Sequence, residues 1–321
     1  MSTVKTASTV KTASTVLITG AAGFIGRNLA AHLSEQGVRV FGVDNFCVPP
    51  TGPLPLPVEH RDVRDLTPED LRGVDTVVHL AALKSVPGSF HDPANLTHNL
   101  GTDHHVLAVF AASDARRLLL AGTCEVYGQQ VGHNREDDRL RPRSPYAVGK
   151  AATEMLADVY RSLAPEKEIG VARFFNTYGP DEGADAVVPA FLDAVHEDGV
   201  CRIEGDGEQA RDLTHIGDMV RMLATVLAAD RLPEVVNLGS GQATCVREIA
   251  ERIIEIAGTG RIEHVASRPN EIHSFLADMG RFRALFGAGP GRDLSEGLAA
   301  AHRGRLLLTA RRDAEPTATA R

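Results

Sequence analysis

Tyr146 and Lys150 are the residues of this sequence whose types and spacing could most directly do chemistry. A separation of four residues places two side chains on the same face of a helix. A phenol has an ordinary pKa near ~10, so it acts as a base near neutral pH only beside positive charge, which a lysine supplies. The pair could therefore remove the proton of a hydroxyl group while hydride leaves the same carbon.

A glycine-rich loop near the amino terminus could hold a dinucleotide. Gly20, Gly23 and Gly26 follow a short apolar run and precede a segment of helical pattern. Glycine lets the backbone approach a pyrophosphate, and a helix N-terminus supplies free amides and positive potential. Asp44 ends the next apolar run, where an acidic residue binds ribose hydroxyls. The pattern predicts a site that prefers NAD to its phosphorylated form, with Asp62 as a candidate adenine contact.

The elements that must position these residues follow from an alternation of short apolar runs and longer amphipathic segments. Such alternation predicts βαβ units and a doubly wound α/β fold around a parallel sheet buried on both faces. Because the pattern loosens after Gly179-Pro180, we expect a Rossmann domain with a smaller mixed α/β carboxy-terminal lobe. The expected boundaries are a frayed leader at 1–14 that repeats STVKTA, the NAD-binding Rossmann domain at 15–179 with a return segment at 212–240, the substrate-binding lobe at 180–211 and 241–308, and a mobile tail at 309–321.

Charge and composition exclude several classes of protein. The 321 residues include 34 Lys and Arg against 42 Asp and Glu, and the net charge of −8 argues against nucleic acid or an anionic membrane as a partner. No apolar run reaches the ~18 residues of a membrane helix. Four scattered cysteines lack disulfide or ligand spacing, and the histidines lack a third convergent ligand. We therefore expect a soluble, cytoplasmic protein without a metal site.

Further motifs recur in order along the chain. They are His79-Leu-Ala-Ala82, Asn99-Leu-Gly-Thr102, Glu125-Val-Tyr-Gly128, Tyr146-Ala-Val-Gly-Lys150, Arg173-Phe-Phe-Asn176-Thr-Tyr-Gly-Pro180 and Arg211-Asp212. With the glycine loop, they resemble the extended short-chain dehydrogenase/reductase superfamily, in its nucleotide-sugar epimerase/dehydratase branch. The resemblance implies an NAD-dependent enzyme that acts on a UDP-sugar and forms a homodimer.

The resemblance also implies roles for individual residues. Thr123 would hydrogen-bond the same sugar oxygen as Tyr146. The expected cofactor contacts are Gly20, Gly23, Phe24, Ile25, Gly26, Asp44, Asn45, Asp62, Val63, Leu80, Ala81, Ala82, Asn99, Tyr146 and Lys150. The expected substrate contacts are Lys84, Ser85 and Val86 in a loop similar to that of 4-epimerases acting on UDP-N-acetylhexosamines, Asn176, Arg211 and Arg268 at the diphosphate, Val188 and Phe191 at the uridine, and Glu271 at a ribose.

The triplet Thr123-Cys124-Glu125 indicates the reaction. In this family the residues after the catalytic Ser or Thr separate the reactions, and 4,6-dehydratases resemble Thr-Asp-Glu. Oxidation at C4 acidifies the C5 hydrogen, so Glu125 could remove it as a base while Cys124, a thiol at neutral pH, protonates the departing C6 hydroxyl. The triplet is most similar to that of a UDP-N-acetylglucosamine 5,6-dehydratase of nucleoside antibiotic biosynthesis, in which hydride returns to C4.

Four alternatives remain open. A UDP-sugar 4-epimerase would leave Glu125 incidental and Cys124 a small buried residue. A sugar-nucleotide 4,6-dehydratase would return hydride to C6. A UDP-glucuronate decarboxylase also carries Thr-x-Glu, but with acidic residues where this chain has Ala147-Val148-Gly149. A catalytically silent NAD-binding regulator conflicts with the intact tyrosine, lysine and threonine.

Overall fold

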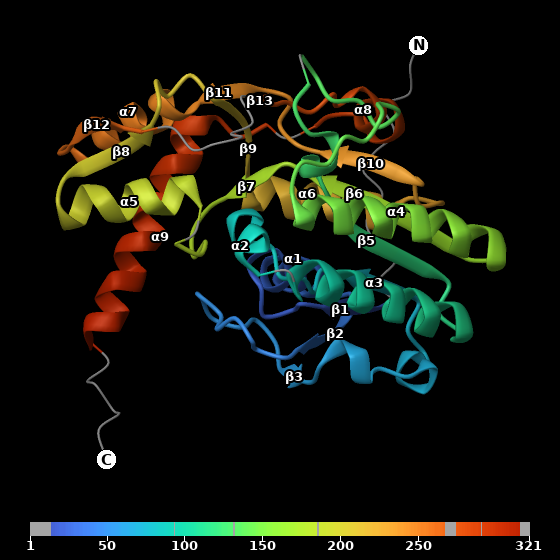
Figure 1. Ribbon diagram of the computed structural model, residues 1–321. Coiled ribbons are helices and arrows are strands. Elements are labelled where there is room, and N and C mark those ends of the chain that lie inside the picture. Colours follow the sequence, from blue (N-terminus) through green and yellow to red (C-terminus); the bar gives the residue numbers. More distant parts are fainter. Residues whose placement is uncertain are drawn as a thin grey trace, which may run out of the picture.

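The computed structural model describes residues 14–92, 94–130, 132–184, 186–266, 274–289 and 291–314. Figure 1 shows a large sheet flanked by helices, formed mainly by the blue to green half of the chain, and a smaller yellow to red lobe beside it. The predicted leader lies outside the described residues except for Ser14, which precedes the first strand.

The large sheet is parallel and has seven strands in the order β10-β6-β5-β4-β1-β2-β3. Because β1 pairs with both β2 and β4, the winding of the chain reverses there. Ligands of such sheets bind at the carboxyl ends of the strands beside this reversal. The predicted doubly wound fold is confirmed. The strands are β1 (Thr15–Thr19), β2 (Arg39–Asp44), β3 (Val58–His60), β4 (Thr76–His79), β5 (Arg117–Thr123), β6 (Glu168–Phe174) and β10 (Val235–Leu238).

Alternate residues of the central strands are buried on opposite faces of the sheet. Val16 and Ile18 of β1 belong to one hydrophobic cluster, whereas Leu17 between them belongs to another. Helices α1 and α6 contact each other and contribute to the first cluster, and α3 and α4 pair in the same way at the second. These helices are α1 (Phe24–Glu35), α3 (Ala94–Ala112), α4 (Pro145–Leu163) and α6 (Ile216–Ala228), and the short elements between strands are η1 (Val63–Asp65), η2 (Pro68–Leu71), α2 (Val86–His91) and η3 (Cys124–Tyr127).

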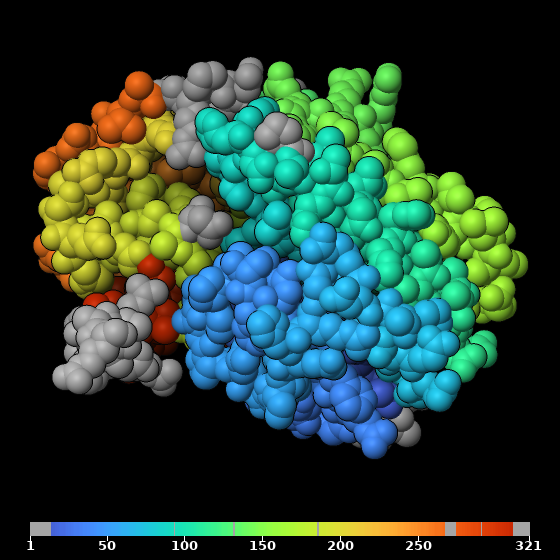
Figure 2. Space-filling view, turned by 60° about the horizontal axis from the view of Figure 1, so that its bottom comes forward, coloured from blue at the N-terminus to red at the C-terminus, as the bar shows by residue number. Residues whose placement is uncertain are grey.

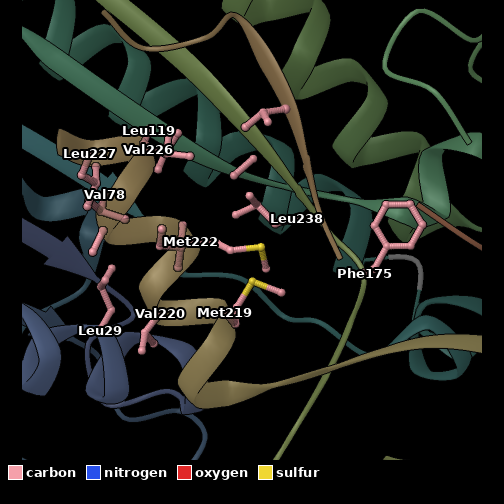
Figure 3. Close-up of a cluster of buried hydrophobic side chains, with 14 of the residues drawn as sticks. Leu29, Val78, Leu119, Phe175, Met219, Val220, Met222, Val226, Leu227 and Leu238 are labelled. Atoms are coloured by element: carbon pink, nitrogen blue, oxygen red, sulfur yellow. The ribbon is translucent and has the colours of Figure 1, made fainter. Parts of the chain in front are cut away.

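Helix α6 is part of the large core although it follows the first strands of the lobe. Figure 3 shows Met219, Met222 and Leu227 of this helix among the side chains of Val78 and Leu119 from the sheet. Each such side chain contributes roughly 1.5–3 kcal/mol when it is fully buried. The core therefore fixes α6, and with it the end of β9, against the Rossmann part.

The smaller lobe contains two short sheets. In one, β9 lies between β11 and β13 and also pairs with β7; in the other, β8 pairs with β12. Helices α5, α7 and α9 contribute to a third hydrophobic cluster, which closes the lobe. The elements are β7 (Asn176–Tyr178), α5 (Val187–Glu197), β8 (Val200–Glu204), β9 (Ala210–His215), β11 (Ala243–Cys245), α7 (Val246–Ala257), β12 (Arg261–Val265), β13 (Ser274–Phe275), α8 (Gly280–Phe286) and α9 (Leu294–Ala314).

The structure differs from the expected boundaries in three places. β7 and the whole of β9 lie in the lobe, because they pair with each other rather than with the large sheet. Helix α8 contacts β10, and its Phe282 is buried in the first cluster, so this segment returns to the Rossmann part. Helix α9 continues to Ala314, past the expected start of the mobile tail, since Ala, Leu and Arg favour a helix.

His215 is buried where β9 ends and α6 begins. Its Nδ1 accepts a hydrogen bond from the backbone N–H of Gly217 at 3.0 Å. Burial, together with the charge of Arg292, lowers the pKa of His215 to about 4. Protonation of Nδ1 would remove the lone pair that caps the helix, so the folded protein favours the neutral ring.

We expect the free energy of unfolding to decrease as pH falls from 6.5 to about 4. In that window the unfolded chain binds a proton at His215 that the folded chain does not, and the lowered pKa corresponds to roughly 3 kcal/mol at most. Urea unfolding of the wild type and His215→Asn across this window measures the effect, since asparagine caps a helix without titrating. An identical pH dependence in the two proteins would contradict this assignment.

Candidate active site

The glycine loop after β1 lies against the loop after β4. Gly20 has φ of 68°, in the left-handed region, and a Cβ there would lie 2.7 Å from the backbone nitrogen of Ala81. A Cβ on Gly26 would overlap the carbonyl oxygen of Gly20. Glycine is therefore required at both positions, and it keeps the loop backbone accessible to a ligand.

The start of α1 has the properties of an anion site. Gly23 is its N-cap residue and Phe24 and Ile25 form its first turn, and in the described part of the chain no side chain caps the free amides of this turn. Asp44 lies beside the loop, with Oδ2 accepting from the N–H of Ala22 at 3.0 Å and Oδ1 from that of Phe46 at 2.8 Å. The free amides suit a pyrophosphate and the anchored carboxylate suits ribose hydroxyls, so this region fits NAD.

The expected cofactor contacts Asn45, Asp62 and Val63 lie close together after β2 and β3. Asn45 donates from Nδ2 to Oδ2 of Asp62 at 3.0 Å, and Val63 is buried at the start of η1. Arg64 donates to both carboxylate oxygens of Asp62 at 2.9 Å, and this contact holds the pKa of Asp62 well below its usual range. Adenine recognition by Asp62 stays a prediction.

Asn99 is buried and shapes the loop that contains Leu80, Ala81 and Ala82. Its Oδ1 accepts from the N–H of Leu83 at 2.9 Å, and its Nδ2 donates to the carbonyl oxygen of Leu83 at 3.0 Å. The sequence predicts that Asn99 touches the cofactor. In the structure these contacts fix the loop, and direct binding by Asn99 stays a prediction.

Tyr146 and Thr123 meet where β5 ends and α4 begins. The hydroxyl of Ser144 caps α4 by accepting from the N–H of Ala147 at 3.1 Å, which places Tyr146 in the first turn. Its side chain is buried and hydrogen-bonds the hydroxyl of Thr123. Burial raises the pKa of Tyr146 above its ordinary value, and nearby acidic groups add to the rise, whereas the bond with Thr123 opposes it.

Lys150 forms a buried ion pair that the sequence analysis missed. Its Nζ lies 3.2 Å from Oδ2 of Asp103 on α3, and both side chains are almost completely buried. His79 and Thr153 hydrogen-bond the same carboxylate, at 3.0 and 2.5 Å. A signal was present: Asn95, Asn99 and Asp103 recur every four residues and form a polar row along α3 that turns out to be buried.

Cys124 and Glu125 begin η3, directly after Thr123. Cys124 is buried within the first hydrophobic cluster, and burial together with the charge of Glu125 raises the pKa of its thiol well above the ordinary value. Glu125 is half-buried, and burial raises the pKa of its carboxyl group, while Arg211 opposes the rise. The thiol therefore keeps its proton, and the carboxyl group is shifted toward the range of a general acid or base.

The predicted diphosphate contacts lie at the junction of the two parts. Arg211 on β9 acts to lower the pKa of both Glu125 and Cys124 through its charge, so its guanidinium lies within electrostatic reach of the end of β5. Asn176 is exposed at the start of β7, which pairs with β9. Figure 2 shows a hollow between the yellow lobe and the blue to green Rossmann part.

The other predicted substrate residues are distributed differently. Lys84 and Ser85 are exposed, and the Ser85 hydroxyl caps α2 by accepting from the N–H of Gly88 at 3.0 Å, immediately before Val86. Val188 and Phe191 are buried in the cluster of the lobe, so in this structure their side chains pack against α7 and α9 residues. The predicted contacts Arg268 and Glu271 lie outside the described residues.

Two observations limit other kinds of site. Within the described ranges, no group of three or more His, Cys, Asp or Glu side chains could hold a metal ion. In the same residues, no helix is both long enough and apolar enough to cross a bilayer.

Comparisons with known proteins agree with this geometry. Residues 16–239 match the NAD dependent epimerase/dehydratase family. TunA, described as an NAD dependent NDP-hexosamine 5,6-dehydratase involved in tunicamycin biosynthesis, is 37% identical, with a TM-score of 0.87 over 92% of this chain and 98% of its own. MoeE5, solved with UDP-glucose and NAD, is 33% identical, with a TM-score of 0.84 over 94% and 100%. The uncharacterized UDP-glucose epimerase YtcB of Bacillus subtilis is 30% identical over 88% of this chain and 95% of its own.

The chain belongs to the NAD-dependent epimerase/dehydratase family of extended short-chain dehydrogenases/reductases. It is an enzyme of that family, and its cofactor is NAD. The prediction of the family and of the cofactor from the glycine loop and the Tyr146–Lys150 pair is confirmed.

Proposed function

We propose that the protein is a 5,6-dehydratase of UDP-N-acetylglucosamine in nucleoside antibiotic biosynthesis. The observation that carries the proposal is the placement of Cys124 and Glu125 within the electrostatic reach of Tyr146, next to Thr123. A thiol that keeps its proton and a carboxyl group with a raised pKa are the acid and the base that elimination of water needs. The likeness to TunA supports the same reaction.

The residues of the chain divide the proton transfers among them. Tyr146, hydrogen-bonded to Thr123, takes the proton of the C4 hydroxyl. With NAD held at the glycine loop, the cofactor would supply the hydride acceptor and donor for C4. Glu125 removes the proton of C5, now beside a ketone, and the Cys124 thiol protonates the C6 oxygen, which leaves as water. Glu125 then passes its proton to the Cys124 thiolate, and Tyr146 returns its own to the C4 oxygen, so that the protein is unchanged.

A UDP-sugar 4-epimerase is the second candidate. The burial of Cys124 in the hydrophobic cluster favours it, because a small core residue is what an epimerase needs at this position. The exposed loop with Lys84 and Ser85 resembles that of epimerases acting on UDP-N-acetylhexosamines. An epimerase would use Tyr146 and Thr123 in the same way and would leave the C5 hydrogen in place.

The experiment is to incubate the purified protein with UDP-N-acetylglucosamine and catalytic NAD and to examine the product by mass spectrometry and proton NMR. Loss of one water with vinylic protons is the expected result. A new methyl group would instead identify a 4,6-dehydratase, and an unchanged mass with inversion at C4 would identify an epimerase. Either of these results would overturn the proposed reaction.

Other features of the chain support a UDP-sugar as partner and the cytoplasm as location. Arg211 offers a guanidinium within electrostatic reach of Glu125, and guanidinium groups bind diphosphates well. MoeE5, a structural relative, was solved with UDP-glucose. The four cysteines at 47, 124, 201 and 245 are free thiols, which suits a reducing compartment.

We also propose that the protein forms a homodimer through α4. Val148, Met155 and Val159 lie on one face of this helix, with 45%, 62% and 52% of their surface exposed. The double substitution Met155→Glu/Val159→Glu is expected to give a monomer in size-exclusion chromatography with light scattering, because it places two charges in the apolar face. Leu306→Glu, on α9 with 45% of its surface exposed, is the control and should leave the dimer intact. A double variant that retains the dimer mass would contradict this interface.

A further inference from the structure

A row of buried polar side chains connects the sheet to Lys150. Thr19 Oγ1 shares a hydrogen bond of 2.6 Å with His79 Nδ1, and His79 Nε2 lies 3.0 Å from Oδ1 of Asp103. Lys150 Nζ and Thr153 Oγ1 meet the other oxygen of Asp103, at 3.2 and 2.5 Å. These five side chains are 3% exposed or less, and they come from β1, β4, α3 and α4.

Asp103 remains ionised in this dry environment. Burial alone would raise the pKa of its carboxyl group, but the charge of Lys150 and the hydrogen bond with His79 outweigh burial and hold the pKa below its ordinary value. The carboxylate and the ammonium therefore form a pair without net charge. Lys150 alone would favour the loss of a proton from Tyr146, and the negative charge of its partner Asp103 acts in the opposite direction.

The groups that face Tyr146 come from three elements other than its own helix. Asp103 lies on α3, Thr123 ends β5, and Cys124 and Glu125 begin η3, while Lys150 is one turn further along α4. Among these charged groups, Asp103 raises the pKa of Tyr146 most strongly after burial itself. The proton on Tyr146 is thus more tightly held than the Tyr146–Lys150 spacing alone predicts.

We propose that Asp103 is a positioning residue that fixes the Lys150 ammonium and whose negative charge opposes the loss of the Tyr146 proton. Tyr146 then gives up its proton only when the positive charge of oxidised NAD is also present. C4 oxidation therefore starts only when the cofactor and the sugar are both bound. The same charge favours the return of the proton to the C4 oxygen in the last step. This inference rests on the proposed role of Tyr146 as the base, which dehydratases and epimerases share.

The test is the pH dependence of sugar oxidation in a single turnover, followed as reduction of the bound NAD after UDP-N-acetylglucosamine is added. In Asp103→Asn the rising limb of this profile is expected to move to lower pH by about one unit, the usual effect of one nearby charge. An asparagine keeps an oxygen that can accept from Lys150 and Thr153. Because oxidation at C4 precedes elimination, reduction of NAD can still be measured if the protein proves to be an epimerase.

Two further variants separate charge from structure. Thr153→Val removes a hydrogen bond to Asp103 but no charge. The rising limb of its pH profile should therefore stay at the wild-type pH, even if the rate of sugar oxidation falls. Asp103→Ser is a second variant without the charge and should show the same shift as Asp103→Asn. The proposal would be overturned if the rising limb of the pH profile stayed at the wild-type pH in both Asp103 variants. Failure of both variants to fold would also overturn it, because Asp103 would then have a structural role only.

Discussion

Replacing Tyr146 with phenylalanine is expected to lower the rate of C4 oxidation by about 10²-fold to 10⁴-fold, the usual contribution of a positioned acid or base. Phenylalanine keeps the ring in its buried place at the start of α4 but removes the hydroxyl that hydrogen-bonds Thr123. Reduction of bound NAD in a single turnover with UDP-N-acetylglucosamine measures this step directly. Because both candidate reactions begin with it, the loss is expected for either one.

Tyr160→Phe is the matched control for this prediction. Tyr160 lies on the same helix, where its ring contacts His104 away from Thr123, so the variant should oxidise the sugar at the wild-type rate. Thermal unfolding of both variants checks that the helix is unchanged. Wild-type oxidation by Tyr146→Phe would remove Tyr146 from the mechanism, and the absence of oxidation in the wild type itself would favour an NAD-binding regulator.

The large sheet could be predicted from the sequence because its signal is local. A strand of a parallel sheet is apolar on both faces, so each of the central strands forms a short apolar run between helical segments. The short strands of the lobe carry no such signal. β7 has three residues, and only its pairing with β9, more than 30 residues away, assigns it to the lobe.

The sequence predicted those site residues that belong to recognisable motifs. Tyr146, Thr123 and Glu125 meet because the carboxyl end of β5 lies beside the start of α4, which a doubly wound sheet dictates. Asp103 was missed because an acidic residue within a helix is usually on its solvated face. Its burial depends on α3 and α4 packing together, and no short motif contains that contact.

Replacing Glu125 with glutamine is expected to slow the loss of water by about 10²-fold to 10⁴-fold, while C4 oxidation continues. Glutamine has the shape of the carboxylate but cannot take the C5 proton. Burial raises the pKa of Glu125, so dehydration by the wild type should fall as pH drops through that raised value, because only the ionised carboxylate is a base. In Glu125→Gln this decrease of dehydration at low pH should disappear. The dependence of C4 oxidation on pH should remain.

The measurement is the mass and proton NMR of the product together with NAD reduction in the same sample, so that oxidation and elimination are seen separately. Cys124→Ala is the companion variant: it removes the thiol but leaves Glu125, so exchange of the C5 hydrogen with deuterated water should persist while water loss slows. A wild-type product that keeps its C5 hydrogen and its C6 oxygen would identify an epimerase. The two variants thus separate the base from the acid, because removal of the C5 proton needs only Glu125, whereas departure of the C6 hydroxyl also needs the proton that the buried thiol retains.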